Sequence, residues 1–183
     1  MTDLAMLALD VGVNERTLRR AVSQGTLRGT RPTPRTLNLP VRERHYVRRS
    51  WPLLADLRAA LRTEHNVRFA LLFGSAAAGT DTAESDVDIL VDLTDPSLER
   101  VVDLSEKLER VLGRRVDLIR LHDAEADPLF LADVVSDGRV IVDRERLWPQ
   151  LRESKADLRR RGNAQRVSRA HGALAAIDRL IGV

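Results

Sequence analysis

Two aspartates, Asp86 and Asp88, stand one residue apart at the start of the apolar stretch VDILVDL. Residues two apart on a β-strand point to the same side, so Val87, Ile89 and Val91 would occupy the other side. Two carboxylates held together repel each other, and a divalent cation between them removes that repulsion. Mg²⁺ prefers oxygen ligands, usually one or two carboxylates completed by substrate phosphates and water. Alone, such a pair is more often a solubilising feature of an exposed strand edge.

A glycine–serine pair, Gly74-Ser75, directly follows the apolar run Val67–Phe73, which predicts a buried strand. Gly79 comes shortly afterwards, so this segment predicts a tight turn of small residues. A glycine in such a turn lets backbone N–H groups approach a phosphate, and the serine hydroxyl adds a donor. Taken alone, a Gly-Ser turn carries no information about a ligand.

A third carboxylate, Asp117, lies within Arg115–Leu121, which has the composition of a strand. If this strand pairs with Val87–Leu93, Asp117 joins the first two aspartates, where it could bind the same metals or act as a general base for an incoming hydroxyl. The alternative is a salt bridge to Arg115 or Arg120. Because the three features occur in order on successive predicted strands, we favour the shared site.

The combined pattern is an apolar residue, Gly-Ser, ten intervening residues, Asp-x-Asp and a later aspartate. It resembles the motif of the polymerase-beta-type nucleotidyltransferases, most of all the minimal nucleotidyltransferases of bacteria, over about residues 50–145. The resemblance implies a nucleotidyltransferase in which an acceptor hydroxyl attacks the α-phosphorus of a nucleoside triphosphate, with ATP the expected donor, and pyrophosphate leaves. It also implies a triphosphate site at Gly74 and Ser75, and two Mg²⁺ ions held by Asp86, Asp88 and Asp117.

One position departs from that motif. Related sequences often read Gly-Ser-x-Ala-Arg-Gly, whereas this chain has Ala78 where the arginine would stand. An arginine there could steady the phosphates or the turn, so its absence puts catalytic efficiency in question. The three aspartates are retained, which argues against an inactive domain.

Apolar spacing elsewhere predicts the elements that must position these residues. A helix beginning at Ser50, with Pro52 in its first turn, should precede the first strand. A second helix should begin at Asp95-Pro96, end at Gly113 and bury an apolar side made of Leu98, Val101, Val102, Leu108 and Val111. A helix over residues 126–136 and a strand over 139–142 follow. The predicted fold class is therefore α/β (α+β), a nucleotidyltransferase fold with a mixed sheet flanked by helices.

The first 30 residues predict two short helices around the turn Asp10–Val13, with Asn14 as N-cap and Gly25 as the stop of the second helix. This pattern resembles the small DNA-binding helix-turn-helix units of bacterial regulators. The alternative is a solvated helix face that only packs on the next domain. The resemblance implies nucleic-acid contacts from Arg16, Arg19 and Arg20.

These elements divide the chain into three predicted parts. Residues 1–49 would form the helix-turn-helix unit and a proline-rich linker, residues 50–146 the nucleotidyltransferase domain, and residues 147–183 a basic helical tail. In that tail apolar residues recur at spacings of three and four, which suits packing on a partner helix or on the chain's own core. They are Val167, Ala170, Leu174, Ile177 and Ile181.

Charge and composition narrow the classes of protein. Net charge is +6 over residues 1–50, −8 over 51–150 and +5 over 151–183, so a basic head and tail flank an acidic middle. The chain has no cysteine, which excludes disulfides and thiolate zinc sites. Its longest uncharged run, residues 69–80, is too short to cross a bilayer. We expect a cytoplasmic protein with no signal peptide and no membrane partner.

Three functions fit these features. The first is transfer of AMP to a protein hydroxyl, because bacterial minimal nucleotidyltransferases are typically antitoxins that modify a small helical HEPN-type toxin. The second is a small-molecule nucleotidyltransferase, similar to aminoglycoside adenylyltransferases, although only about 40 residues follow the last predicted strand. The third is a DNA-binding regulator that uses residues 1–30 and carries a nucleotide-binding domain.

Overall fold

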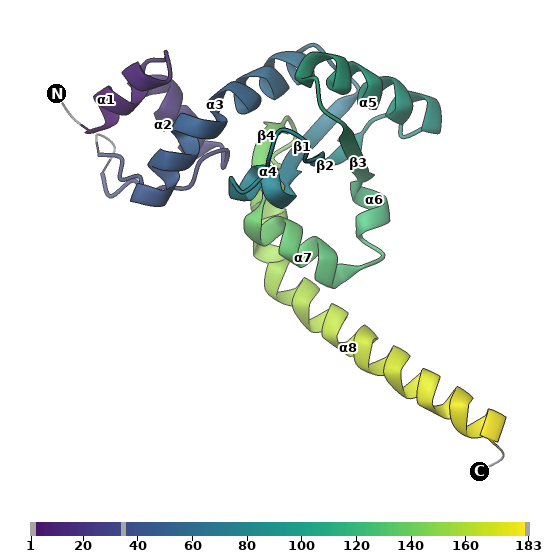
Figure 1. Ribbon diagram of the computed structural model, residues 1–183. Coiled ribbons are helices and arrows are strands. Elements are labelled where there is room, and N and C mark those ends of the chain that lie inside the picture. Colours follow the sequence, from purple (N-terminus) through teal and green to yellow (C-terminus); the bar gives the residue numbers. More distant parts are fainter. Residues whose placement is uncertain (1–2, 34–35, 182–183) are drawn as a thin grey trace.

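The computed structural model describes residues 3–33 and 36–181, with side chains described up to residue 171. The ribbon has three parts: a pair of short N-terminal helices, a central sheet between helices, and a long C-terminal helix that leads away from the sheet (Figure 1). The N-terminal pair is α1 (Asp3–Asp10) and α2 (Glu15–Ser23).

The sheet has four strands in the order β3-β2-β1-β4. They are β1 (Val67–Phe73), β2 (Val87–Leu93), β3 (Val116–Arg120) and β4 (Arg139–Asp143). β1 is antiparallel to both β2 and β4, whereas β2 and β3 run parallel. Each predicted strand is confirmed to within one residue at either end. The strands could be predicted because short, nearly continuous apolar runs form strands that are buried on both faces of a sheet.

Helices cover both faces of the sheet. One face packs against α3 (Val41–Arg62) and α5 (Leu98–Leu112). The other packs against α6 (Leu121–Ala124), α7 (Pro128–Asp137) and the first turns of α8 (Leu147–Ile181). A short helix, α4 (Gly74–Ala78), follows β1 directly. The mixed sheet between helices confirms the predicted fold class.

The prediction that a helix begins at Ser50 is wrong, because α3 begins nine residues earlier, at Val41. Tyr46 and Val47 are buried in its first half, as Leu54 and Leu57 are in its second. Pro52 therefore lies inside the helix, where it removes one backbone hydrogen bond, and the burial on either side keeps the helix continuous. The predicted division at residue 50 falls within α3.

The start and the buried side of α5 also differ from prediction. The helix begins at Leu98 after Ser97, and the carboxylate of Asp95 accepts the N–H of Ser97 (3.0 Å) in the turn before it. Its inner side consists of Leu104 and Leu108. The expected buried residues Leu98, Val102 and Val111 are instead exposed, because they lie on either side of the face that meets the sheet. Gly113 ends the helix with a φ of +63°, as predicted.

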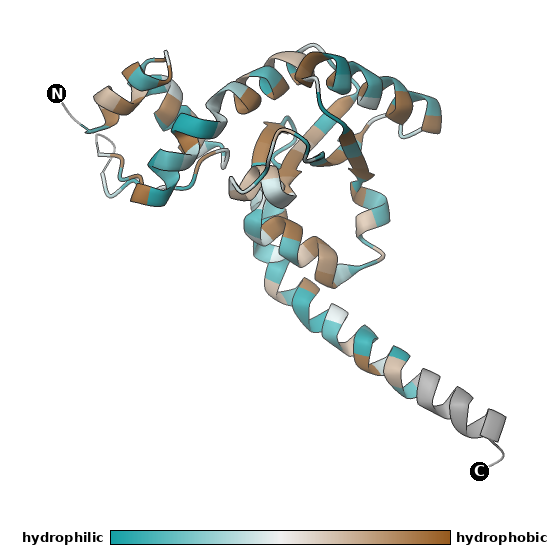
Figure 2. Ribbon diagram, in the orientation of Figure 1, coloured by the Kyte–Doolittle hydropathy of each residue, from teal (hydrophilic) through white to brown (hydrophobic). Residues whose placement is uncertain are grey.

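In the N-terminal pair, the side chain of Asn14 accepts the backbone N–H of Thr17 (2.8 Å), which confirms the predicted N-cap. Gly25 has a φ of +83°, also as predicted. In α8, Val167 and Ala170 are exposed, and the side chains of Leu174, Ile177 and Ile181 lie outside the described residues. Beyond α7 the described part of α8 is mostly hydrophilic (Figure 2). No described helix has the length and apolarity to cross a membrane.

Candidate active site

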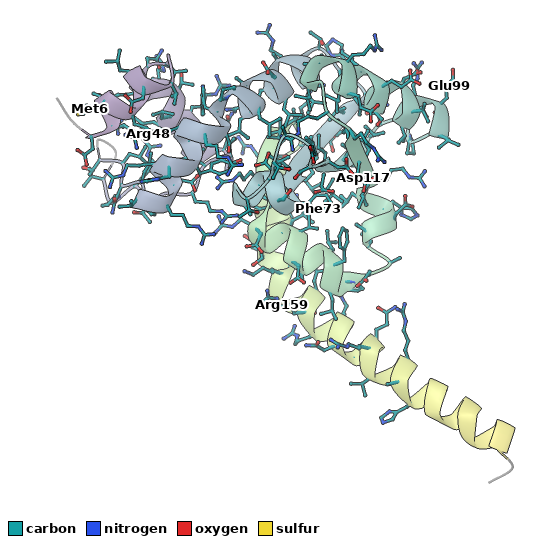
Figure 3. All side chains as sticks on the ribbon, in the orientation of Figure 1. Met6, Arg48, Phe73, Glu99, Asp117 and Arg159 are labelled. Atoms are coloured by element: carbon teal, nitrogen blue, oxygen red, sulfur yellow. The ribbon has the colours of Figure 1, made fainter. Side chains whose placement is uncertain are left out.

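Three residues form a row across one end of the sheet. Phe73 of β1 is paired with Asp88 of β2, and Asp88 is paired with Asp117 of β3. Side chains that pair in this way share one face of the sheet, and neighbouring strands lie about 5 Å apart. Figure 3 labels Phe73 and Asp117, the two ends of this row. The ring of Phe73 also packs edge to face against that of Phe130 of α7 (ring centroids 5.7 Å apart), so apolar side chains lie at this end of the row.

Asp88 is the most perturbed carboxyl in this row. Burial raises its pKa above the ordinary value, and the negative charges of Asp117 and Asp86 raise the pKa further. Asp86 is more exposed, with an arginine, Arg115, 3.7 Å away. In the residues that the structure describes, neither Asp88 nor Asp117 forms a hydrogen bond or ion pair. The structure therefore brings Asp88 and Asp117 together, with Asp86 near enough to repel Asp88.

The donor chemistry of this cluster fits a hard divalent cation, because carboxylate oxygens are the ligands that Mg²⁺ prefers. Burial and then the negative charges of Asp117 and Asp86 raise the pKa of Asp88, and a bound cation would offset all three effects. Over the described ranges, no three His, Asp or Glu side chains are gathered closely enough to hold a metal ion. The carboxylates would thus have to draw together around a bound cation.

Gly74 touches the same carboxylate. Its φ is +67°, a conformation that side-chain-bearing residues rarely adopt. A Cβ atom built on this residue would lie 2.1 Å from the Oδ2 atom of Asp88, which is far too close. Ser75 follows in the first turn of α4 and is partly exposed. Both the backbone conformation and the contact require glycine here, and they bring the Gly-Ser turn against the aspartate row.

Sequence reasoning missed the group that holds the loop between α4 and β2. Asp81 is buried and forms an ion pair with Arg114 (2.8 Å) and a longer one with Arg49 (3.5 Å). Arg114 also donates twice to the carbonyl of Ser85 (3.0 and 2.7 Å), and Arg49 donates to the carbonyl of Gly79 (2.7 Å). Arg114 is thus a structural clamp on the loop that leads to Asp86. The one feature near Arg114 in the sequence that could have drawn attention to it is the preceding glycine, Gly113.

A second missed group holds α4 from the side away from the aspartates. Arg139 is buried, pairs with Glu43 (2.5 and 3.0 Å) and lies 3.4 Å from the centre of the Tyr46 ring. Its Nε atom donates to the carbonyl of Ala77 (2.7 Å), while the Tyr46 hydroxyl donates to the carbonyl of Ala76 (3.2 Å). Two carbonyls of this short helix are therefore fixed by side chains from β4 and α3.

The same ion pair ties the N-terminal unit to the sheet. Glu43 accepts the backbone N–H of Arg28 (2.8 Å), and Arg139 donates to the carbonyl of Thr26 (3.2 Å). The Thr26 hydroxyl donates in turn to the carbonyl of Val140 (2.6 Å). The N-terminal helices are thus joined to the body through buried polar contacts.

The predicted nucleic-acid residues lie on α2, away from the aspartate row. Arg19 pairs with Glu15 (3.1 Å) on the same helix. Arg16 and Arg20 are exposed. These positions leave the prediction of DNA contact untested.

Comparisons with known proteins identify the family of this chain. Residues 55–147 match the family described as "Polymerase beta, Nucleotidyltransferase". A putative protein adenylyltransferase of Methanocaldococcus jannaschii is 40% identical over 70 residues, which cover 37% of this chain and 70% of that protein. The protein adenylyltransferase MntA of Thermococcus cleftensis is 44% identical over 68 residues, covering 37% and 69%.

Solved structures show the same fold. A crystal structure of a toxin–antitoxin with AMP-PNP superposes with a TM-score of 0.55 at 23% identity, covering 66% of this chain and 98% of that one. A crystal structure of the toxin–antitoxin MntA–HepT gives a TM-score of 0.52 at 20% identity, covering 68% and 98%. The matched family spans half of the sequence and includes every residue of the row. The chain therefore belongs to the polymerase-beta nucleotidyltransferase family and is a nucleotidyltransferase.

Proposed function

We propose that this protein transfers AMP from ATP to a hydroxyl group of a partner protein, with two Mg²⁺ ions held by Asp86, Asp88 and Asp117. The observation that carries the proposal is the uncompensated carboxylate row beside Gly74, where neither Asp88 nor Asp117 has a described partner. The names of the sequence relatives, both protein adenylyltransferases, support the class of acceptor.

The reaction needs few groups from the protein. The oxygen of the acceptor hydroxyl forms a bond to the α-phosphorus of ATP, the bond from that phosphorus to the bridging oxygen breaks, and pyrophosphate leaves. The hydroxyl proton passes to a base, for which Asp117 is our candidate, since it is the exposed carboxylate of the row. Bound Mg²⁺ would neutralise the charge that develops on the attacking and leaving oxygens.

The Gly-Ser turn is the proposed phosphate site. Gly74 brings backbone against Asp88, and Ser75 offers a partly exposed hydroxyl one residue later. Ala78 is exposed at the end of α4 and supplies no charge. The phosphates would therefore be held by the turn and the cations, without a contribution from this position.

We further propose that the partner is a small helical toxin of the HEPN type and that this chain is its antitoxin. The fold neighbours come from toxin–antitoxin pairs, one of them crystallised with AMP-PNP. The described part of α8 beyond the body is basic and exposed, which suits docking on a protein surface. A small-molecule acceptor has less support, because the sequence relatives are named as protein adenylyltransferases.

Labelling tests the proposal directly. The protein is incubated with ATP labelled at the α-phosphate, Mg²⁺ and the protein encoded by the neighbouring gene, and we expect that protein to become labelled. Asp88→Asn should abolish the label. Asp92→Asn is the matched control, because Asp92 is on the same face of β2 but pairs with Arg68 (2.8 Å).

Two outcomes would overturn parts of the proposal. If the Asp88→Asn variant labelled the partner protein as strongly as the wild type does, the assignment of the active site would be wrong. Labelling of a small molecule, with no label on any protein, would replace the proposed acceptor by the aminoglycoside-like alternative.

A further inference from the structure

A pocket of about 690 Å³ lies at the opposite end of the sheet from the aspartate row. It is formed where α2 and α3 meet the end of β4, and arginines from all three regions line it. Since β1 spans seven residues, the two ends of the sheet are separated by about 20 Å. The pocket is therefore distinct from the proposed nucleotidyl-transfer site. The basic side chains in its lining are Arg20, Arg58, Arg62, Arg144 and His65.

The only acidic group in this lining is already engaged. The two oxygens of Asp143 accept the backbone N–H groups of Leu147 (2.8 Å) and Trp148 (3.1 Å) at the start of α8. Its charge is thus directed at a helix N-terminus, where a carboxylate is favourable. The pocket keeps a strong excess of positive charge.

Neutral oxygens hold two of the four arginines in place. Arg144 donates to the carbonyls of Leu61 and Arg62 (both 3.2 Å), and Arg58 donates to the side-chain amide oxygen of Gln24. None of the four arginines forms a salt bridge to a carboxylate within the described residues. The guanidinium groups of Arg58 and Arg144, which are held in place and have no counter-charge, are suited to bind an anion with little reorganisation.

Crowding of like charge makes the empty pocket unfavourable. Burial lowers the pKa of Arg58, and the positive charge of Arg20 lowers that pKa further. Both effects disfavour the charged guanidinium. A bound anion between the two side chains would reverse them, so anion binding should stabilise the folded chain.

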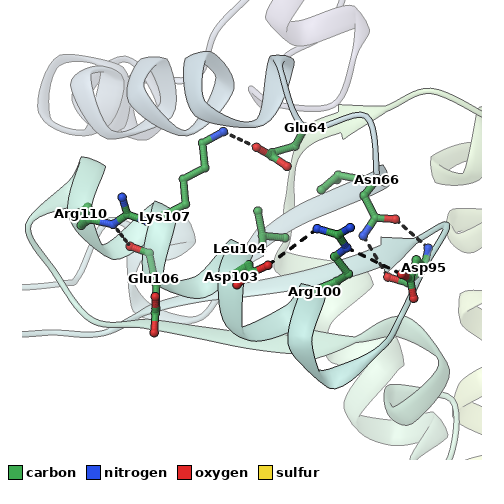
Figure 4. Close-up of a pocket in the computed structure, with 10 residues that line it drawn as sticks. Glu64, Asn66, Asp95, Arg100, Asp103, Leu104, Glu106, Lys107 and Arg110 are labelled. Carbon is green, nitrogen blue, oxygen red and sulfur yellow. Dashed lines mark hydrogen bonds and ion pairs between the residues drawn. The ribbon is translucent and has the colours of Figure 1, made fainter.

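A second pocket shows what an ordinary charged surface looks like in this molecule. It has a volume of about 500 Å³ beside α5, and Figure 4 shows its lining. There Lys107 faces Glu64, and Arg100 lies 3.8 Å from both Asp95 and Asp103. These two cations have acidic neighbours, in contrast to the arginines of the first pocket, whereas Arg110 donates to the backbone carbonyl of Glu106 (3.2 Å).

We propose that the pocket between α2, α3 and the end of β4 binds a small anion carrying a di- or triphosphate group, as free pyrophosphate or as a nucleotide. The planar fork of arginine matches phosphate oxygens in pairs, and four arginines suit a ligand with several negative charges. The volume lies within the usual range of small-molecule sites. Ile141 and Val142 contribute an apolar patch that a nucleoside could cover.

Calorimetric titration of the whole chain with pyrophosphate, ATP and adenosine tests this inference. EDTA is included so that the carboxylate row cannot bind nucleotide through metal. We expect saturable binding of pyrophosphate and ATP and none of adenosine. Equal affinities for the first two indicate a phosphate site alone, whereas tighter binding of ATP identifies the ligand as a nucleotide.

Variants connect the binding to the pocket. Arg20→Gln and Arg62→Gln remove two arginines whose side chains have no described hydrogen bond, and each should weaken binding at least about tenfold, as loss of a charged phosphate contact does. Arg110→Gln, in the second pocket, is the matched control and should bind as the wild type does.

Folding does not confound this comparison. Arg20→Gln relieves repulsion on Arg58, so its free energy of unfolding should not fall, and urea unfolding checks this.

The inference is overturned if pyrophosphate and ATP fail to bind the wild type, or if both arginine variants bind them unchanged. Binding of duplex DNA alone, lost in the same variants, would also overturn it and assign the pocket to a nucleic-acid backbone. The Arg20→Gln variant should label the partner protein as the wild type does, which would show that this pocket is functionally distinct from the nucleotidyl-transfer site.

Discussion

Asp81 and Asp88 lie seven residues apart, one in the loop before β2 and the other near the start of that strand. Asp81 is buried between Arg114 and Arg49, so its negative charge is matched by two positive ones. Asp88 is partly buried beside Asp117 and Asp86, and no cation faces it in the described structure. The first arrangement is complete within the chain, whereas the second becomes favourable only when a cation arrives from outside. Charge compensation thus separates a carboxylate that holds the loop from one that can bind metal.

The largest effect should come from Asp88→Asn. It removes a charge from the proposed metal site, and we expect partner labelling to fall by on the order of 100- to 1000-fold, as for other groups that stabilise transition-state charge. The measurement is the initial rate of label transfer at saturating ATP and Mg²⁺. If Asp81→Asn slowed transfer as much while the fold stayed intact, the distinction between the two carboxylates would be lost.

Asp81→Ala should have the largest effect on stability. It leaves the partly buried guanidinium of Arg114 without its carboxylate, and breaking a largely buried pair in this way costs about 3 kcal/mol. Urea unfolding measures the loss. Asp103→Ala, at an exposed carboxylate of α5, is the control and should change the free energy of unfolding by less than about 0.5 kcal/mol. A loss no greater than the control's would show that the clamp does not stabilise the loop.

Mg²⁺ should stabilise the wild type but not Asp88→Asn. At ten times its dissociation constant, an ion that binds only the folded chain adds about 1.4 kcal/mol to the free energy of unfolding. Thermal unfolding with and without Mg²⁺ measures this as a shift of Tm. Asp92→Asn should keep the shift, because Asp92 is neutralised by Arg68. An equal shift in the Asp88 variant would place the cation elsewhere.

The smallest effect is on the pH dependence of stability without metal. The pKa of Asp88 is raised in the folded chain, so the unfolded chain loses this proton at a lower pH than the folded chain does. Stability from this group therefore decreases as the pH rises from the unfolded pKa through the folded one. Asp88→Asn should flatten that part of the profile and raise the metal-free stability at pH 7. A steeper profile in the variant would contradict the raised pKa.

The aspartate row could be predicted because its signals are local. A strand repeats every two residues, so Asp86 and Asp88 had to share a side once Val87–Leu93 was identified as a strand. Pairing of β2 with β3 was the one long-range assumption, and the register of Asp88 with Asp117 agrees with it. What these residues bind and catalyse stays a prediction.

The supporting groups could not be predicted because their partners are distant in sequence. Glu43 and Arg139 are 96 residues apart, and Asp81 and Arg114 are 33 apart. Nothing near any of these residues distinguishes them from ordinary surface charges. The early start of α3 was missed for a related reason. The prolines and arginines before residue 50 are typical of a linker, and Pro52 is typical of the first turn of a helix, but burial of Tyr46 and Val47 extends the helix to Val41.

The Arg139–Glu43 pair also limits how this protein could have acquired its N-terminal helices. Its donors and acceptors come from three sources: the segment after α2, the helix α3, and the edge strand β4. To this pair the segment after α2 contributes only backbone atoms, the carbonyl of Thr26 and the N–H of Arg28. A different N-terminal unit would fit the same catalytic body only if its backbone followed the same path past Glu43 and Arg139.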